Sequence, residues 1–194
     1  MVDMVHRLQD TICAAVQAVD GVPYREDEWT REEGGGGRSR VFSGGALFEK
    51  AGVNVSVVQG TLSPEAAAKM GGGHDLEGDD LEFFATGLSL VFHPHNPMAP
   101  TVHANYRYFE RGEGTVEGSW WFGGGADLTP SYLFEEDAIH FHTRYSKRRV
   151  TGTKSLITTP SSNGVILIST SNTVVNVAVW AVSYTHLRAH ETEE

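Results

Sequence analysis

Residues 84–109 read FATGLSLVFHPHNPMAPTVHANYRYF, and this stretch decides the fold. Two runs rich in β-branched, aromatic and aliphatic residues, 84–92 and 102–109, flank a proline-rich segment. Short runs of this composition, bounded by turn-forming residues, are typical of β-strands. The stretch therefore predicts two strands of one sheet, joined by the segment 93–100.

Polar residues recur at every second position of both runs. Because side chains of a strand alternate between its two faces, Ser89 and His93 share one face of the first run, and His103, Asn105 and Arg107 share one face of the second. If the strands pair, these five side chains converge on a single surface. The alternative interpretation is a sheet with one solvated face, which is common in antiparallel sheets.

The flanking segments supply further strands and helices. Apolar residues at helical spacing predict a helix over residues 5–19, which Asp20-Gly21 ends; they are Val5, Leu8, Ile12, Val16 and Val19. We expect strands at 40–42, 46–49 and 53–58, a short helix capped by Ser63, and another helix beginning at Thr129-Pro130. This order predicts one α+β domain with an antiparallel sheet.

Composition excludes several classes of function. The formal net charge of −10 over 194 residues argues against a nucleic-acid partner. Cys13 is the only cysteine, so the chain forms no intrachain disulfide and no thiolate zinc cluster. Because no apolar run is long enough to span a membrane and no leader segment is recognisable, we expect a cytoplasmic protein without a membrane partner.

Residues 120–130 read WWFGGGADLTP, and residues 134–142 read FEEDAIHFH. Glycines beside aromatic residues indicate a backbone that comes close to a flat ligand. Together with the pattern S-x-V-x-H-P-x-N-P…P-T-x-H-x-N-x-R in the two predicted strands, these motifs resemble the oxygen-dependent coproporphyrinogen-III oxidases. The resemblance runs from Leu8 to His142. It implies an antiparallel β-sheet flanked by helices on both faces, a homodimer, and a reaction that turns two propionates of coproporphyrinogen III into vinyl groups with O₂.

The resemblance also implies roles for individual residues. It makes His103 the catalytic proton donor and gives Ser89, Asn105, Tyr106 and Arg107 contacts with the substrate. These assignments agree with general chemistry, because arginine binds carboxylates through paired hydrogen bonds and histidine transfers protons at neutral pH.

Two other positions have open interpretations. Asp127 either accepts a hydrogen bond from a pyrrole N–H of the substrate or caps a turn. The glycine-rich residues 34–40 do not match a phosphate-binding loop, and their composition indicates a flexible turn. Because the resembling family has a similar run, Arg38 or Arg40 is a candidate for reaching a propionate.

A metal site is a further hypothesis. Some members of the resembling family are described with a divalent ion, which here implies the ligands His93, His103 and His142. The alternative is that these are ordinary hydrogen-bonded histidines. The resemblance implies O₂ as co-substrate and no organic cofactor. A histidine-ligated metal oxygenase of another kind is a weaker alternative.

The composition changes after His142. When the codons of residues 163–181 are displaced by one base, they permit the sequence with which the family continues, so we expect residues 143–181 to be out of frame. Residues 182–194 match a translated sequencing adapter, and we assign no function to them. With residues 1–142 as part of an oxidase domain, we expect an inactive chain. The alternative function is a non-catalytic fragment that binds porphyrinogen or pairs with intact subunits.

Overall fold

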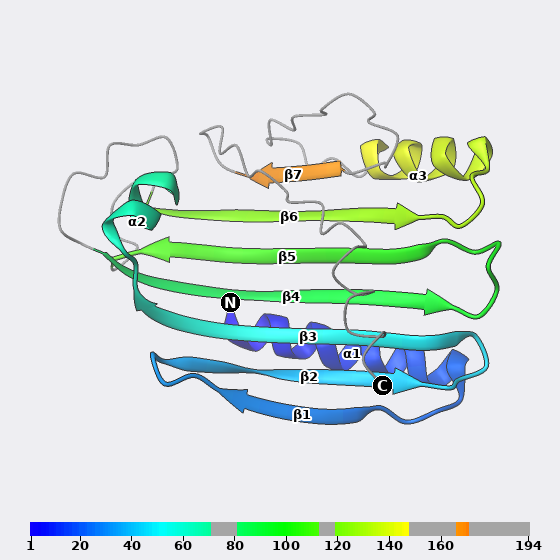
Figure 1. The fold of residues 1–194 in the computed structure, drawn as a ribbon, viewed down its shortest axis with the longest axis horizontal. Coiled ribbons are helices and arrows are strands. Elements are labelled where there is room, and N and C mark those ends of the chain that lie inside the picture. Colours follow the sequence, from blue (N-terminus) through cyan, green and yellow to red (C-terminus); the bar gives the residue numbers. More distant parts are fainter. Residues whose placement is uncertain (71–80, 113–118, 148–165, 171–194) are drawn as a thin grey trace, which may run out of the picture.

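The structure, a computed structural model, describes residues 1–70, 81–112, 119–147 and 166–170. The described residues form an open sheet in which each strand pairs antiparallel with the next one along the chain (Figure 1). The helices are α1 (Val2–Asp20), α2 (Pro64–Met70) and α3 (Glu135–Lys147). The strands, in both sequence and spatial order, are β1 (Arg25–Thr30), β2 (Gly35–Ser43), β3 (Phe48–Thr61), β4 (Glu82–Pro94), β5 (Thr101–Arg111), β6 (Trp120–Thr129) and β7 (Ile166–Thr170).

Most of the predicted elements are present. The runs at 84–92 and 102–109 are the central parts of β4 and β5, and the helix predicted over 5–19 is α1. Gly21 ends α1 in the left-handed conformation, with φ of 76°, and its N–H donates to the Gln17 carbonyl. The hydroxyl of Ser63 accepts a hydrogen bond of 3.2 Å from the Ala66 N–H, which confirms the predicted cap of α2.

Three predictions of local structure were wrong. The segments 46–49 and 53–58 are not separate strands, because β3 runs without a break from Phe48 to Thr61. The glycine-rich residues 34–40 do not form a flexible turn, because all but Gly34 belong to β2, which is paired on both sides. Glycine at 37 is needed there because a Cβ would overlap the ring of Trp29, its neighbour on β1. The helix predicted to begin at Thr129 begins at Glu135, since β6 continues to Thr129 before the chain turns.

Helix α1 packs across β3 and β4 and forms the core with them. Its buried side chains recur three or four residues apart, which places them on one stripe of the helix. Burying each large aliphatic or aromatic side chain of this core stabilises the fold by about 1.5–3 kcal/mol. The core residues are Val5, Cys13, Val16, Phe42, Ala51, Val53, Val55 and Leu88.

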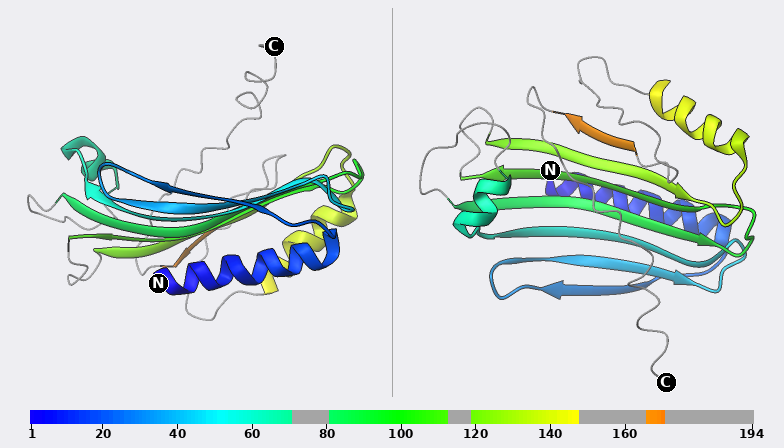
Figure 2. Two further views of the ribbon diagram at one scale, coloured as in Figure 1. Left: turned by 90° about the horizontal axis from the view of Figure 1, so that it is seen from below. Right: turned by 45° about the horizontal axis from the view of Figure 1, so that its top comes forward.

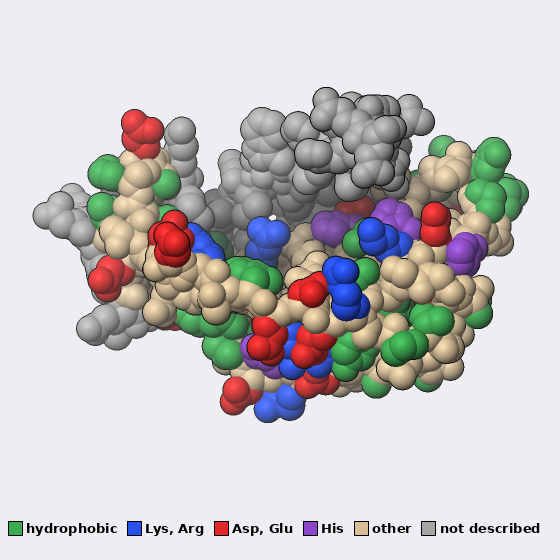
Figure 3. Space-filling view, turned by 60° about the horizontal axis from the view of Figure 1, so that its bottom comes forward, with side chains coloured by type: hydrophobic (Ala, Val, Ile, Leu, Met, Phe, Trp, Pro, Cys, Tyr) green, Lys and Arg blue, Asp and Glu red, His purple; other side chains and the backbone are tan. Residues whose placement is uncertain are grey.

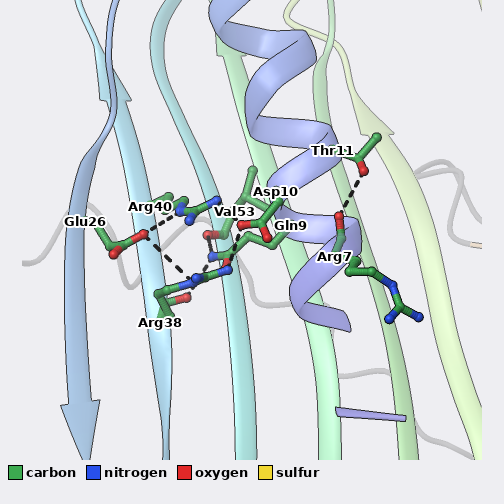
Figure 4. A network of polar contacts seen from close by, with 8 residues as sticks. All are labelled: Arg7, Gln9, Asp10, Thr11, Glu26, Arg38, Arg40 and Val53. Carbon is green, nitrogen blue, oxygen red and sulfur yellow. Dashed lines mark hydrogen bonds and ion pairs between the residues drawn. The ribbon is translucent and has the colours of Figure 1, made fainter. Parts of the chain in front are cut away.

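A polar network also fixes α1 to the sheet (Figure 4). The fully buried Gln9 amide donates to the Val53 carbonyl at 2.8 Å and accepts from the Arg38 guanidinium at 2.7 Å. The Arg40 guanidinium donates to Asp10 of α1 and to Glu26 of β1, both at 2.6 Å. These bonds join α1 to β2 and β3 and join β2 to β1, so the orientation of α1 is set by polar contacts as well as by apolar burial.

The described helices do not cover the two faces of the sheet equally. Figure 2 shows α1 and α3 on the same side of the curved sheet and α2 at one end of it. The α+β class with an antiparallel sheet is confirmed. Of the region predicted to be out of frame, the structure describes only residues 143–147 and 166–170, so the frame remains a prediction. Within the described residues, no helix is long and apolar enough to cross a membrane.

Candidate functional site

The predicted pairing of the two central strands is confirmed. Ser89 of β4 lies opposite Asn105 of β5. His103 and Arg107, two residues before and two residues after Asn105, lie on the same surface. Strand β6 continues the surface, because its Asp127 lies opposite His103. We call this surface of β2–β6 the polar face, and the opposite surface, against which α1 packs, the helix face.

His103 and Asp127 form a hydrogen-bonded pair on the polar face. The Nδ1 atom of His103 lies 2.8 Å from an Asp127 carboxylate oxygen, and the side chains are 39% and 25% exposed. Because an ionised carboxylate only accepts hydrogen bonds, the pair holds a proton on Nδ1. The second ring nitrogen, Nε2, is then the atom that gains or loses a proton. Asp127 does not cap a turn, because it lies within β6 and its carboxylate bonds to His103. The hydrogen bond to a pyrrole N–H of the substrate stays a prediction.

Arg107 lies four residues after His103 on the same face of β5 and is exposed. Within the described part of the chain, its guanidinium has no ion pair or hydrogen bond to the protein. Gly123 is its partner on β6, and a Cβ at Gly123 would meet no described atom within 4 Å. Packing among the described residues therefore does not require glycine at position 123. Gly123 leaves the backbone of β6 without a side chain beside Arg107, and the Arg107 guanidinium is available to an anionic ligand.

Gly124 serves a different purpose from Gly123. It lies on the helix face, where a Cβ would be 3.0 Å from the Tyr106 ring and in closer contact with the Asn105 carbonyl. Tyr106 itself lies opposite Leu88 and Gly124, so the structure does not bring it to the polar face with the other predicted substrate contacts. The alternation of side chains along β5 separates Tyr106 from both of its sequence neighbours.

The candidate arginines of the glycine-rich segment are also on the helix face. Arg38 and Arg40 lie opposite Val55 and Val53, which belong to the core beneath α1. Burial alone would lower the pKa of Arg40, but its hydrogen bonds to Glu26 and Asp10 raise that pKa above its ordinary value. Because both guanidinium groups are bound to protein partners and lie away from the polar face, the idea that either one reaches a propionate was wrong.

The three histidines of the predicted metal site come from separate places. His93 and His103 share the polar face, whereas His142 belongs to α3. His93 lies 3.4 Å from the Thr101 hydroxyl through its Nδ1 atom. Among the described residues, no three His, Cys, Asp or Glu side chains are grouped closely enough to hold a metal ion. The described residues therefore do not fit a metal site, and we derive no step through one.

The polar face is wider than the sequence analysis suggested. Ser39, Asn54 and Ser56 lie on it in β2 and β3, in register with the site of β4 and β5. The signal for the latter two was present, because residues 53–56 read Val-Asn-Val-Ser and alternate in polarity. Figure 3 brings the β1 edge forward and shows acidic and basic side chains intermingled along it, with histidine side chains gathered beyond them.

Comparison with known proteins identifies the family of this chain. The family model of coproporphyrinogen III oxidase matches residues 1–156, which extends beyond the boundary predicted at 142. The chain is 53% identical over 146 residues to coproporphyrinogen-III oxidase 1, chloroplastic, of Arabidopsis thaliana. It is 52% identical over 146 residues to the oxygen-dependent coproporphyrinogen-III oxidase, chloroplastic, of Glycine max, and 50% identical over 147 residues to that of Nicotiana tabacum.

These matches cover 72% of this chain and 37–38% of the three relatives. The chain thus spans less than two fifths of the length of the curated relatives that it matches. The matched part includes every strand of the polar face, from β2 through β6. The chain therefore belongs to the coproporphyrinogen III oxidase family.

Proposed function

We propose that the polar face is part of the substrate site of an oxygen-dependent coproporphyrinogen-III oxidase. In the proposed reaction, each of two propionate side chains reacts with one O₂ and becomes a vinyl group, with release of CO₂ and H₂O₂. The substrate carbon chain loses its carboxyl group and one hydrogen, and O₂ is the electron acceptor. No organic cofactor enters this scheme. The proposal rests on family membership and on the names of the three relatives.

The observation that carries the proposal is the position of His103, hydrogen-bonded to Asp127 and four residues from the exposed Arg107 on the same face of β5. A porphyrinogen with four propionates needs cationic groups for its carboxylates, and a planar guanidinium binds a carboxylate with two parallel hydrogen bonds. Arg107 is the residue that we assign to this role. Ser89 and Asn105 lie opposite one another next to it, and we assign them polar contacts with the same ligand.

His103 is the group that we assign to proton transfer. Its Nδ1 atom is held by Asp127, so the imidazole ring is fixed in one orientation and the reactive proton is on Nε2. Asp127 then acts through His103, which makes it a positioning residue. This arrangement lets one ring give a proton to the substrate and recover it from water without moving from the sheet.

The proposal is tested by binding and turnover assays on the 194-residue chain. Binding is measured by the fluorescence of coproporphyrin III, the stable oxidised form of the substrate, and turnover by the appearance of vinyl-bearing product in air. We expect Arg107→Met to weaken binding at least tenfold, which corresponds to losing about 1.4 kcal/mol. Arg7→Met, which removes an exposed cation from α1 on the opposite side of the sheet, is the control. Equal binding by Arg107→Met and the parent chain would refute the assignment.

A second function is a non-catalytic fragment that binds porphyrinogen or pairs with intact subunits. The observation that favours it is the short coverage of the relatives, 37–38% of their length. Binding of coproporphyrin III without turnover of coproporphyrinogen III supports this function over catalysis. Turnover that is lost in His103→Gln supports the oxidase instead.

The proposed oligomeric state follows from the resembling family, and the proposed absence of a nucleic-acid partner follows from the composition. We propose a homodimer without a nucleic-acid partner, which the net charge of −10 supports. Sedimentation velocity of the purified chain distinguishes a dimer from a monomer. The cytoplasmic location stays a prediction, because all three relatives are named as chloroplastic proteins.

A further inference from the structure

A row of four uncharged polar side chains crosses four neighbouring strands on the polar face. Ser39 of β2 lies opposite Asn54 of β3, Asn54 lies opposite Ser89 of β4, and Ser89 lies opposite Asn105 of β5. Neighbouring strands are about 4.8 Å apart, so the row extends roughly 14 Å across the sheet. Ser89 and Asn105 belong to the site described above, whereas Ser39 and Asn54 continue the row beyond it.

The fold itself does not use these side chains. In the portion of the chain that the structure describes, none of the four makes a side-chain hydrogen bond to the protein. Asn54 is exposed and the hydroxyl of Ser39 is half-buried. Polar groups in the middle of a sheet that have no protein partner are available to water or to a ligand. A sheet needs no such groups at these positions, because β-branched residues are more favourable on a pleated surface.

The two neighbouring rows place only small or aliphatic residues of β3 and β4 beside the polar row: Ser56 and Gly87 on one side, Gly52 and its partner Val91 on the other. The first of these rows also contains Gly37, which the Trp29 ring covers, Arg107, whose stem lies against Gly87, and Gly123. A Cβ at Gly52 would meet only the Val91 side chain, at 3.8 Å. A planar ligand can therefore lie across β3 and β4 without displacing a large side chain, with Arg107 toward one end and Ser39 toward the other.

We propose that Ser39 and Asn54 form a second carboxylate subsite, which binds a propionate of the tetrapyrrole distant from the one bound by Arg107. The inference rests on the proposed function and adds to it a contact that determines how many propionates the polar face binds. The Ser39 hydroxyl and the Asn54 amide each donate a hydrogen bond to carboxylate oxygens. The subsite is neutral, so it selects the substrate by geometry and Arg107 supplies the charge.

The test compares two porphyrins that differ in the number of propionates. Coproporphyrin III carries four, and protoporphyrin IX carries two. We expect the double variant Ser39→Ala, Asn54→Leu to bind coproporphyrin III about tenfold more weakly, the loss typical of one charge-assisted hydrogen bond, and to bind protoporphyrin IX within twofold of the parent chain. Gln59→Leu is the matched control, because it removes an exposed amide from the helix face of β3.

A second variant keeps the test decisive if the double variant does not fold. Asn54→Asp replaces the exposed side-chain amide by a carboxylate and so places a negative charge at the subsite. We expect it to weaken coproporphyrin III binding more than the double variant does and to leave the circular dichroism unchanged. The subsite is refuted if both variants bind coproporphyrin III as tightly as the parent chain, or if they lose affinity for both porphyrins equally. In either case Arg107→Met still weakens binding, so the proposed function stands. If the parent chain binds neither porphyrin, the proposed function fails together with the inference.

Discussion

Replacing Arg40 by methionine tests whether the buried arginine is a structural link or a ligand contact. The Arg40 side chain is 8% exposed and lies in the middle of the network between α1, β1 and β2. Its guanidinium donates to Asp10 and Glu26 at 2.6 Å and lies 4.5 Å from the centre of the Tyr24 ring. Methionine keeps most of the aliphatic stem, so the substitution mainly removes the two charge-assisted hydrogen bonds and the contact with the ring.

The expected loss follows from these contacts. A hydrogen bond that involves a charged group contributes about 1.5–3 kcal/mol. The carboxylates of Glu26 and Asp10 are 36% and 53% exposed, so water replaces the arginine once it is removed, and the lower half of that range applies to each bond. A cation–π contact adds roughly 0.5–1 kcal/mol. We therefore expect Arg40→Met to lower the free energy of unfolding by about 3.5–5.5 kcal/mol.

The assay is urea unfolding followed by circular dichroism, with coproporphyrin III binding measured under native conditions. Arg25→Met is the matched control, because Arg25 also pairs with an aspartate but is 75% exposed, and we expect it to change stability by about 0.5 kcal/mol or less. Binding per folded molecule should be unchanged in both variants. A stable Arg40→Met chain that binds the porphyrin weakly would refute the structural role and restore Arg40 as a ligand contact.

Three further predictions concern single residues. Gly124→Ala should destabilise the fold by at least 1 kcal/mol in urea unfolding because its Cβ meets the backbone of β5, whereas Gly123→Ala should leave stability unchanged and weaken porphyrin binding. Burial and the hydrogen bond to Glu110 raise the pKa of Tyr108 to about 12, so stability should fall as pH rises from 10 to 12, a loss that Tyr108→Phe removes. Asp20→Ala should cost about 2–4 kcal/mol, measured by thermal unfolding, since it leaves two loop N–H groups without their acceptor.

The helix at the N-terminus shows how far periodicity reaches. Apolar spacing predicted α1 correctly, but Leu8 and Val19, two residues of the predicted stripe, are 39% and 59% exposed. The buried stripe includes Gln9 and Asp20 instead, because each finds hydrogen-bond partners in the sheet or in the loop before β3. A hydropathy pattern treats such residues as solvent-facing, since it has no knowledge of partners that are distant in the sequence.

The sequence alone determined two strands of the site, β4 and β5, and the side chains they place on one face, but it did not predict β6. Strict alternation assigns His103, Asn105 and Arg107 to one surface of β5 and Tyr106 to the other, and no tertiary information is needed for that. The motifs around residues 120–130 similarly sufficed to suggest the family. Local geometry carries this information, because the period of a strand is fixed by its backbone.

Only the tertiary structure decided which faces meet which partners. The bond of His103 to Asp127 depends on the register between β5 and β6. The positions of Arg38 and Arg40 depend on their hydrogen bonds to Gln9 and Asp10 of α1, which packs across β3 and β4. Nothing in the run of glycines distinguishes Gly123, which leaves the polar face bare, from Gly124, which makes room for backbone. Register and packing arise from contacts between residues far apart in the chain, and such contacts have no signature within any single stretch of sequence.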